Sequence, residues 1–287
     1  MSLLLTFLAI AQVGPFVTPG PQPASPLPPE IVERKRQEQS QPQPVRAAVL
    51  PAPQTELDRC LAGVNADPLR AVDEAQAWLQ QAKGVPASQA GHCLGVALGR
   101  LERWEEAEAA FLSARGMAAD DLERARLGAM AGNAALARGA AEAALTAVDA
   151  AHADALAAGD KPLAGDIAID RARALVALKR DDQAVAALAE ARAAIPRSAQ
   201  AWLLSATLSR RLGKLAEAQA QIEKAAELMP VDPDVGLEAG VIAVLSGRDD
   251  AARRSWQSVI ATAPKSDAAG KAKGYLAQLG QESPAQP

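Results

Sequence analysis

The chain has 287 residues, of which 49% are apolar and only 3% are aromatic. So few rings cannot fill a large globular interior, whereas abundant alanine favours helices whose backbones approach closely. A formal net charge of −4, from 34 acidic and 30 basic residues, argues against nucleic acid as a partner, because binding phosphates requires a concentrated basic face. Long stretches lack the alternating β-branched pattern of strands, so the sequence predicts an all-α protein.

The first segment of the chain resembles an export signal. Its apolar run Leu3–Ala11 is far shorter than the ~20 apolar residues that span a bilayer. Ala9-Ile10-Ala11 fits the small-x-small pattern before a signal-peptidase cut, and a cut near Ala24 is the alternative. No Lys or Arg precedes the run, so a start that is not a signal stays open. We expect residues 1–24 to direct export to the periplasm or outside the cell, with no membrane span after processing; a cytoplasmic location is the alternative.

Proline dominates the next segment, residues 25–53. Because proline fixes φ and lacks a backbone N–H, this segment cannot form regular helix or sheet, and it favours an extended, semi-rigid spacer. We therefore expect a disordered linker over residues 25–53 and a disordered tail over residues 281–287. The prolines of the linker are Pro26, Pro28, Pro29, Pro42, Pro44, Pro51 and Pro53.

From residue 54 the sequence becomes alanine-rich with helical periodicity, and it repeats. A pattern of five positions recurs every 34 residues: a turn residue, a small residue, a large apolar residue, a small or apolar residue, and a proline. Its three consecutive copies are Lys179, Ala184, Leu188, Ala191 and Pro196, then Gly213, Ala218, Ile222, Ala225 and Pro230, then Gly247, Ala252, Trp256, Val259 and Pro264. The pattern recurs upstream as Gly139, Ala144, Val148 and Ala151, and as Glu102, Ala107, Phe111 and Ala114. Such a fixed period predicts stacked pairs of antiparallel helices, since a generic helical bundle has no reason to keep it.

Small residues stand on the first helix of each pair, where a missing side chain lets the two helices pack closely. They are Gly95, Gly132, Ala172, Ala206 and Gly240. With Trp202, the Leu-Gly turn at Leu212-Gly213 and the terminal prolines, this pattern resembles the tetratricopeptide repeat (TPR) family. The resemblance implies a right-handed α-α superhelix, a solenoid of antiparallel helix pairs, over residues 54–280. The family's tyrosine is replaced by Leu98, Ala135, Leu175, Ser209 and Ala243.

The repeats divide the solenoid into units. The predicted units are a degenerate one at about 54–87, followed by 88–121, 125–158, 165–198, 199–232 and 233–266, with a capping helix over 267–279. Residues 159–164 are additional to the period, so we expect a longer second helix in the unit 125–158. Terminal helices of such arrays need a polar outer face, which the amphipathic 267–279 segment provides.

The chain offers little for catalysis. It has two histidines, two cysteines and one tyrosine, and no glycine-rich phosphate loop. His92 and Cys93 point about 100° apart on a helix and do not form a nucleophile–base pair. A zinc site from Cys60, His92, Cys93 and His152 would lack the usual paired-ligand spacing. We interpret acidic pairs such as Asp181-Asp182 as partners of helix dipoles and expect no enzyme, cofactor, metal or small-molecule substrate.

Cys60 and Cys93 fall at nearly equal positions of neighbouring units, on adjacent first helices. In an exported protein they could form a disulfide, which would stabilise the fold by about 3.5 kcal/mol at best in the chain-entropy model. Two buried thiols that act as small hydrophobic groups are the alternative.

In the proteins that this chain resembles, the first helices line a groove that holds a peptide of a partner. The resemblance places groove positions at His92, Val96, Arg100, Arg126, Met130, Asn133, Asp170, Arg173, Leu203, Thr207, Arg210, Glu238 and Val241. The middle of this set is moderately basic, which favours a peptide with some negative charge; solvated arginines without a ligand are the alternative. We therefore expect a non-catalytic scaffold that binds a protein or peptide, or an accessory or regulatory subunit of an envelope enzyme or secretion complex.

Overall fold

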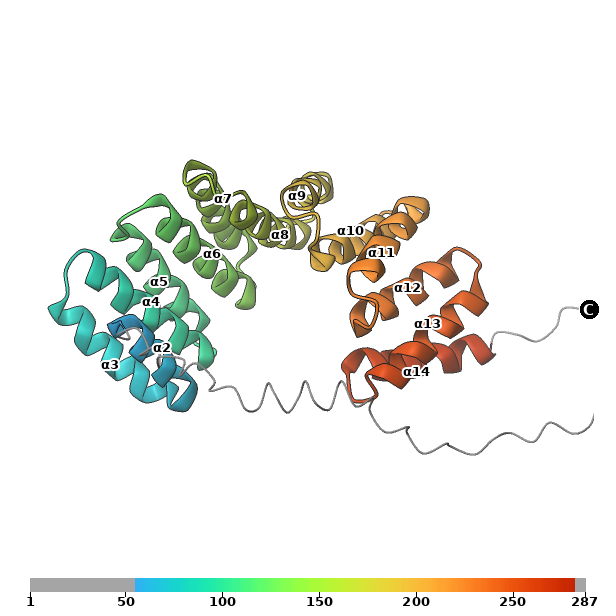
Figure 1. The fold of residues 1–287 in the computed structure, drawn as a ribbon, viewed down its shortest axis with the longest axis horizontal. Coiled ribbons are helices and arrows are strands. Elements are labelled where there is room, and N and C mark those ends of the chain that lie inside the picture. The colour runs from blue at the N-terminus through green and yellow to red at the C-terminus, as the bar shows by residue number, and fades with distance from the viewer. Residues whose placement is uncertain (1–54, 282–287) are drawn as a thin grey trace, which may run out of the picture. The chain divides into compact units, whose positions relative to one another are not determined.

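The computed structural model describes residues 55–281, so the signal-like segment 1–24, the linker 25–53 and residues 282–287 lie outside it. Every regular element of the described part is an α-helix (Figure 1). The helices are α2 (Glu56–Ala66), α3 (Pro68–Gln81), α4 (Val85–Arg100), α5 (Trp104–Gly116), α6 (Asp121–Ala137), α7 (Ala141–Ala157), α8 (Lys161–Ala177), α9 (Asp181–Ala194), α10 (Ala199–Arg211), α11 (Leu215–Leu228), α12 (Pro233–Leu245), α13 (Asp249–Thr262) and α14 (Asp267–Gln281). Among them, none combines the length and apolar character needed to cross a bilayer.

The helices follow one another as a stack of pairs in chain order. Each helix packs against the next one, and the first helices of neighbouring pairs also meet, α2 with α4, α6 with α8, and α10 with α12 (Figure 1). We call α4, α6, α8, α10 and α12 the A helices, and α5, α7, α9, α11 and α13 the B helices. This arrangement is a TPR-like α-solenoid, as the repeat predicted.

The turns between A and B helices share one backbone conformation. Their residues, which the sequence marks at a fixed position, all have positive φ: Glu102 58°, Gly139 81°, Lys179 59°, Gly213 74° and Gly247 70°. After each one, a backbone N–H donates to a carbonyl five residues earlier, as from Lys214 to Ser209 at 2.9 Å. This bond satisfies a carbonyl at the helix end, so the left-handed residue stops the A helix and turns the chain back.

The A and B helices begin differently. Side chains cap the N-termini of α6, α8, α10 and α12: Asp120, Asp160, Ser198 and Asp232. The B helices lack a side-chain cap, but acidic residues occupy their first turns, such as Asp181 and Asp182 in α9. These carboxylates lie where the helix dipole favours negative charge, which is the role that the sequence predicted for them.

Close packing of A against B depends on the small residues. A Cβ added to Gly95 would lie 2.5 Å from Phe111, one on Gly132 2.4 Å from Val148, and one on Gly240 2.1 Å from Trp256. The alanines predicted to face these seams, including Ala107, Ala144 and Ala218, are fully buried. The predicted seams are therefore confirmed.

The helices around the residues inserted after the unit 125–158 are longer than the later B helices. The helices α6, α7 and α8 have 17 residues each, whereas α9, α11 and α13 have 14. Gly159 forms the turn with φ 73°, and α8 begins at Lys161. The longer B helix expected at this unit is observed, together with two longer neighbours.

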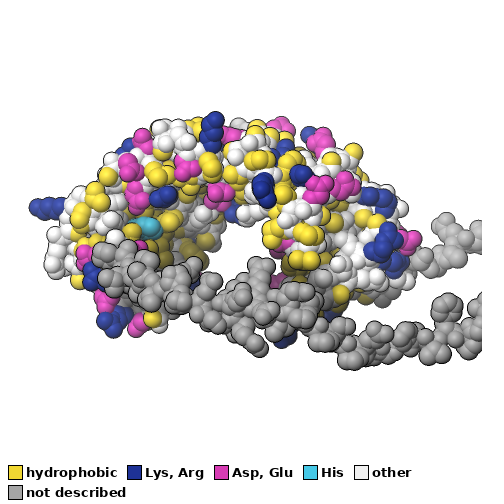
Figure 2. All heavy atoms as spheres, in the orientation of Figure 1, with side chains coloured by type: hydrophobic (Ala, Val, Ile, Leu, Met, Phe, Trp, Pro, Cys, Tyr) yellow, Lys and Arg dark blue, Asp and Glu magenta, His cyan; other side chains and the backbone are white. Residues whose placement is uncertain are grey.

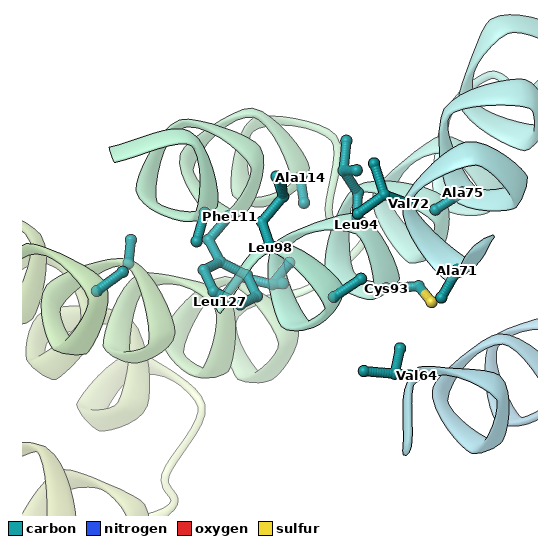
Figure 3. Close-up of a cluster of buried hydrophobic side chains, with 14 of the residues drawn as sticks. Val64, Ala71, Val72, Ala75, Cys93, Leu94, Leu98, Phe111, Ala114 and Leu127 are labelled. Atoms are coloured by element: carbon teal, nitrogen blue, oxygen red, sulfur yellow. The ribbon is translucent and has the colours of Figure 1, made fainter. Parts of the chain in front are cut away.

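The ends of the solenoid have cores of their own. Near the start, buried residues of α2, α3, α4 and α5 cluster with Leu127 of α6 (Figure 3). At the other end, α14 covers α13 through Ala268, Ala269, Ala272 and Leu279, and it continues to Gln281, two residues past the predicted end of the cap.

Candidate functional site: the groove along the A helices

All thirteen residues predicted for the groove are half-buried or exposed on the A helices, and none belongs to the fully buried core. Figure 2 shows hydrophobic, acidic and basic side chains interspersed over the face of the stack in view. The structure brings the predicted residues together in two ways. Some line apolar cavities between successive A helices, and others bond to one another across the next seam.

The first cavity has a volume of about 430 Å³ and lies where α4, α5 and α6 meet. The predicted residues Val96, Met130 and Asn133 line it. Phe111 and Trp104 of α5 also line it, and Gly95 and Gly99 of α4 add no side chain that would fill the space. The cavity is mostly apolar, so it suits a bulky hydrophobic side chain.

A second cavity of about 180 Å³ repeats this construction at α8, α9 and α10. Leu188 of α9 lines it at the position that Phe111 holds in α5, and the predicted residues Arg173 and Thr207 line it from α8 and α10. A third cavity of about 250 Å³, at α12, α13 and α14, is lined by the predicted Val241 together with Trp256 and Tyr275.

Between these cavities, polar side chains of one A helix bond to those of the next, from α6 to α8 and from α10 to α12. Asn133 of α6 donates from Nδ2 to Oδ2 of Asp170 on α8 at 2.9 Å, and Arg173 donates to the other oxygen of Asp170 at 2.7 Å. Arg210 of α10 donates from Nε to Oε1 of Glu238 on α12 at 2.5 Å. Burial raises the pKa of Asp170, against the lowering effect of Asn133 and Arg173. The predicted basic character of the middle of the groove is thus reduced, because Asp170 partly neutralises Arg173.

His92 lies on α4 beside the acidic Glu123 of α6. Its Nδ1 is 3.8 Å from Oε1 of Glu123, and its ring meets the edge of Phe111 at a centroid distance of 6.4 Å. Burial lowers the pKa of His92, and the charge of Glu123 partly opposes this effect. The histidine is therefore a packed side chain on α4, and within residues 55–281 no hydrogen bond joins it to a thiol or hydroxyl.

Three arginines keep their charge toward solvent. Arg100 and Arg126 are exposed, and so is Arg211, which lines the second cavity. None of the three pairs with an acidic side chain within residues 55–281. Leu203 is half-buried and packs against the cluster of α10, α11 and α12. The predicted groove positions therefore include both exposed arginines and residues that line apolar cavities, and Arg211 lies at the second cavity.

The structure joins Cys60 and Cys93 in a disulfide that connects α2 to α4. The two Cα atoms are 6.1 Å apart, and both residues belong to the first core cluster, in which Figure 3 labels Cys93. The bond fixes the first helix of the degenerate unit to the first regular unit. No thiol remains in this part of the chain to act as a nucleophile.

Nowhere in residues 55–281 do three or more His, Cys, Asp or Glu side chains gather into a group that could hold a metal ion. His152, far along the stack on α7, has Nε2 at 2.8 Å from Oε1 of Glu190 on α9. It therefore joins two B helices and does not approach His92 or the disulfide.

The predicted set omits other residues that line the cavities. They come from further positions on the A helices, from the B helices and from α14, and they are Gly99, Trp104, Phe111, Val176, Leu188, Leu204, Arg211, Leu245 and Tyr275. One signal was present in the sequence. The sixth residue of successive units alternates between apolar and acidic, as Met130, Asp170, Leu204 and Glu238.

Comparisons with known proteins identify the fold. No protein-family model matches the chain, and no curated protein matches it. Solved structures do resemble it, at low identity. RapI in its apo form has a TM-score of 0.67 at 12% identity and covers 88% of this chain and 77% of its own. PilW, a widely conserved type IV pilus biogenesis factor, has a TM-score of 0.61 at 18% identity and covers 75% of this chain and 97% of its own.

A further similar structure is TTC0263, a thermophilic TPR protein of Thermus thermophilus. It has a TM-score of 0.53 at 23% identity and covers 66% of this chain and 99% of its own. These likenesses concern the fold, since all lie at low identity. Together with the 34-residue repeat and the serial helix pairs, they show that the chain is a TPR-like helical-repeat protein.

Proposed function

We propose that this protein is a non-catalytic scaffold that binds a segment of a partner protein along the groove of its A helices. The observation that supports this most directly is the set of three apolar cavities, each lined by predicted groove residues. Concave, mostly apolar sites with a few polar groups at their edges are typical of binding sites. The solvent-facing Arg100, Arg126 and Arg211 favour a segment with negative charge.

We further propose that the protein works in the bacterial cell envelope. A disulfide persists in oxidising compartments, and the signal-like segment 1–24 agrees with export. A role as an accessory subunit of an envelope enzyme or secretion complex is the second candidate, because the similar structures include a pilus biogenesis factor.

Site-specific photocrosslinking in cells tests the groove. A crosslinker at Val96 or at Val241 should capture the same partner, whereas one at the exposed Ala189 of α9 should not. The charge reversal Arg126→Glu should weaken capture and reduce its dependence on salt, with Arg254→Glu on α13 as the matched control. Equal capture from the groove and from Ala189 would contradict the groove as the binding site.

The location and the second candidate need separate measurements. N-terminal sequencing of the mature protein should find a start at or near residue 12 or 25, and an intact Met1 in a cytoplasmic fraction would contradict export. An enzyme recovered in one-to-one ratio with the protein would favour the accessory subunit.

A further inference from the structure

Successive A helices also meet at seams, distinct from the A–B seams within a pair, and these alternate between two kinds. We call a seam closed where the two A helices pack directly and open where they do not. Backbones of α6 and α8, and of α10 and α12, pack directly against each other, whereas α4 and α6, and α8 and α10, meet mainly through the B helix between them. The sixth residue of the unit follows the same alternation. It is Asp170 or Glu238 at a closed seam and Met130 or Leu204 at an open one.

At a closed seam the acidic residue bonds back to the preceding A helix. Asp170 accepts from Asn133, and Glu238 accepts from Arg210 with a second contact at 3.3 Å. The side chains of Asp170 and Glu238 are only 14% and 13% exposed, so these polar groups already have partners and offer little to a ligand. A partner segment that crosses a closed seam therefore meets polar groups that are already hydrogen-bonded within the protein.

At an open seam an apolar residue replaces the acidic one and leaves a cavity. Both interior cavities have the same construction, with the A helix before the seam, a large side chain of the B helix, and the A helix after it. Phe111 and Leu188 occupy the same position of their units. Two equivalent apolar cavities thus lie two A helices apart, separated by one closed polar seam.

Charge distinguishes the surroundings of these cavities. Arg211 lines the second one, and Arg100 follows Gly99, which lines the first. No acidic residue of the described part of the chain lines either cavity. Positive charge therefore prevails beside the apolar cavities, which complements acidic residues in a ligand.

On the basis of the proposed function, we propose that the groove selects an extended partner segment with two bulky apolar side chains about six residues apart and acidic residues beside them. One closed step of about 8–10 Å, the distance between directly packed helices, and one longer open step separate the cavities by about 20 Å. An extended chain advances about 3.3–3.6 Å per residue, so about six residues cover this distance.

Fluorescently labelled synthetic peptides test the spacing with the full-length protein. Each peptide carries two leucines separated by three to nine positions in a Ser/Glu background, and its Kd is measured by anisotropy. Affinity should peak near a separation of six residues and fall at least ten-fold when one leucine becomes serine. Replacing the glutamates by lysine should weaken binding, and Arg211→Glu should reduce that preference.

Filling one cavity tests where the anchors bind. The variant Gly99→Leu places a side chain into the first cavity, where a Cβ would meet Trp104 at an ordinary 3.5 Å. It should bind the two-leucine peptide as weakly as wild type binds the one-leucine peptide. Val96→Trp at the same cavity and Val176→Trp at the second should act alike, and Ala189→Leu on the exposed face of α9 is the control. Circular dichroism checks that each variant folds.

The outcomes separate this inference from the proposed function. Affinity that does not vary with leucine spacing, or that is unchanged in all three cavity-filling variants, would overturn the two-anchor inference even if groove crosslinks identify a partner. Absence of any peptide binding at millimolar concentration would overturn it as well. The proposed groove function is tested by the difference in crosslinking between Val96 and Ala189, and not by these peptides.

Discussion

At the residue scale, the turns between A and B helices place glycine at some positions and other residues at others, all in the same left-handed backbone conformation. Three of the turn residues in the repeat are glycines, but Glu102 and Lys179 adopt φ 58° and 59° with a Cβ present. A left-handed conformation costs roughly 1–2 kcal/mol for an ordinary residue, because Cβ approaches the carbonyl oxygen. These two turns are formed because the helices on either side pack well enough to hold them.

Lys179→Gly should therefore raise the free energy of unfolding by about 1 kcal/mol, after the greater entropy of glycine in the unfolded chain is included. Gly213→Ala at the equivalent turn should lower it by a similar amount. Urea unfolding followed by circular dichroism measures both. A Lys179→Gly variant less stable than wild type would contradict the proposed strain of the left-handed backbone at Lys179.

The half-buried His92 should make the free energy of unfolding depend on pH. Its pKa in the folded protein is lowered, chiefly by burial, so the unfolded chain binds a proton first as the pH falls through about 6.5. The contribution of His92 to stability is thus present above this pH and is lost as the pH falls below it. Between pH 7.5 and pH 5, wild type should lose more unfolding free energy than His92→Gln. Parallel pH profiles would show that the histidine is not responsible.

At the scale of the helix pair, the seam between α12 and α13 contains the tightest approach of a glycine to a side chain. Trp256 lies over Gly240, is 3% exposed, and donates from Nε1 to the carbonyl oxygen of Leu237 at 3.1 Å. Any side chain on Gly240 would have to displace the ring, because a Cβ would lie 2.1 Å from its Nε1.

Gly240→Ala should therefore lower the free energy of unfolding by about 1–3 kcal/mol, as overpacking does in other cores, despite the better helix propensity of alanine. Its matched control is Gly270→Ala on α14, where a Cβ would meet nothing within 4 Å. That change should be neutral or stabilise by about 0.5–1 kcal/mol. Trp256 fluorescence should shift in the first variant only. Equal stability of the two variants would contradict the proposed seam.

At the scale of the whole described solenoid, each helix pair contacts only its neighbours, so a local change should have local effects. The disulfide acts at one end, where Cys60 and Cys93 close a loop with a sequence separation of 33. The Gly240 seam lies near the other end. The two perturbations should therefore loosen different parts of the same chain.

Hydrogen exchange measures this separation. Reduction of the disulfide should speed exchange in α2, α3 and α4 and leave α12 to α14 unchanged, and Gly240→Ala should do the reverse. Reduction should also cost up to about 3.5 kcal/mol in the chain-entropy model, and the double variant Cys60→Ala/Cys93→Ala should match the reduced protein. Uniform acceleration over all helices in either case would contradict the local coupling.

Much of this architecture could be predicted from the sequence because it depends on short-range rules. The period of 34 residues, the turn residues with positive φ, and the glycine and alanine seams each depend on residues within one unit. A residue such as Gly132 is small because Val148, sixteen positions later, packs on it in the same helix pair. The thirteen groove positions were assigned in the same register from the resemblance to TPR proteins.

The tertiary structure alone decided which groove residues remain available to a ligand. Sequence reasoning counted Arg173 as a basic groove residue, but Asp170 bonds to it and to Asn133 from the preceding pair. The two interior cavities lie where an apolar sixth residue, Met130 or Leu204, faces side chains of the preceding unit. The packing within one helix pair depends on residues of a single repeat, so it can be predicted from the sequence. Whether two A helices form a cavity or a polar contact depends on side chains from two units, which meet only after the chain has folded.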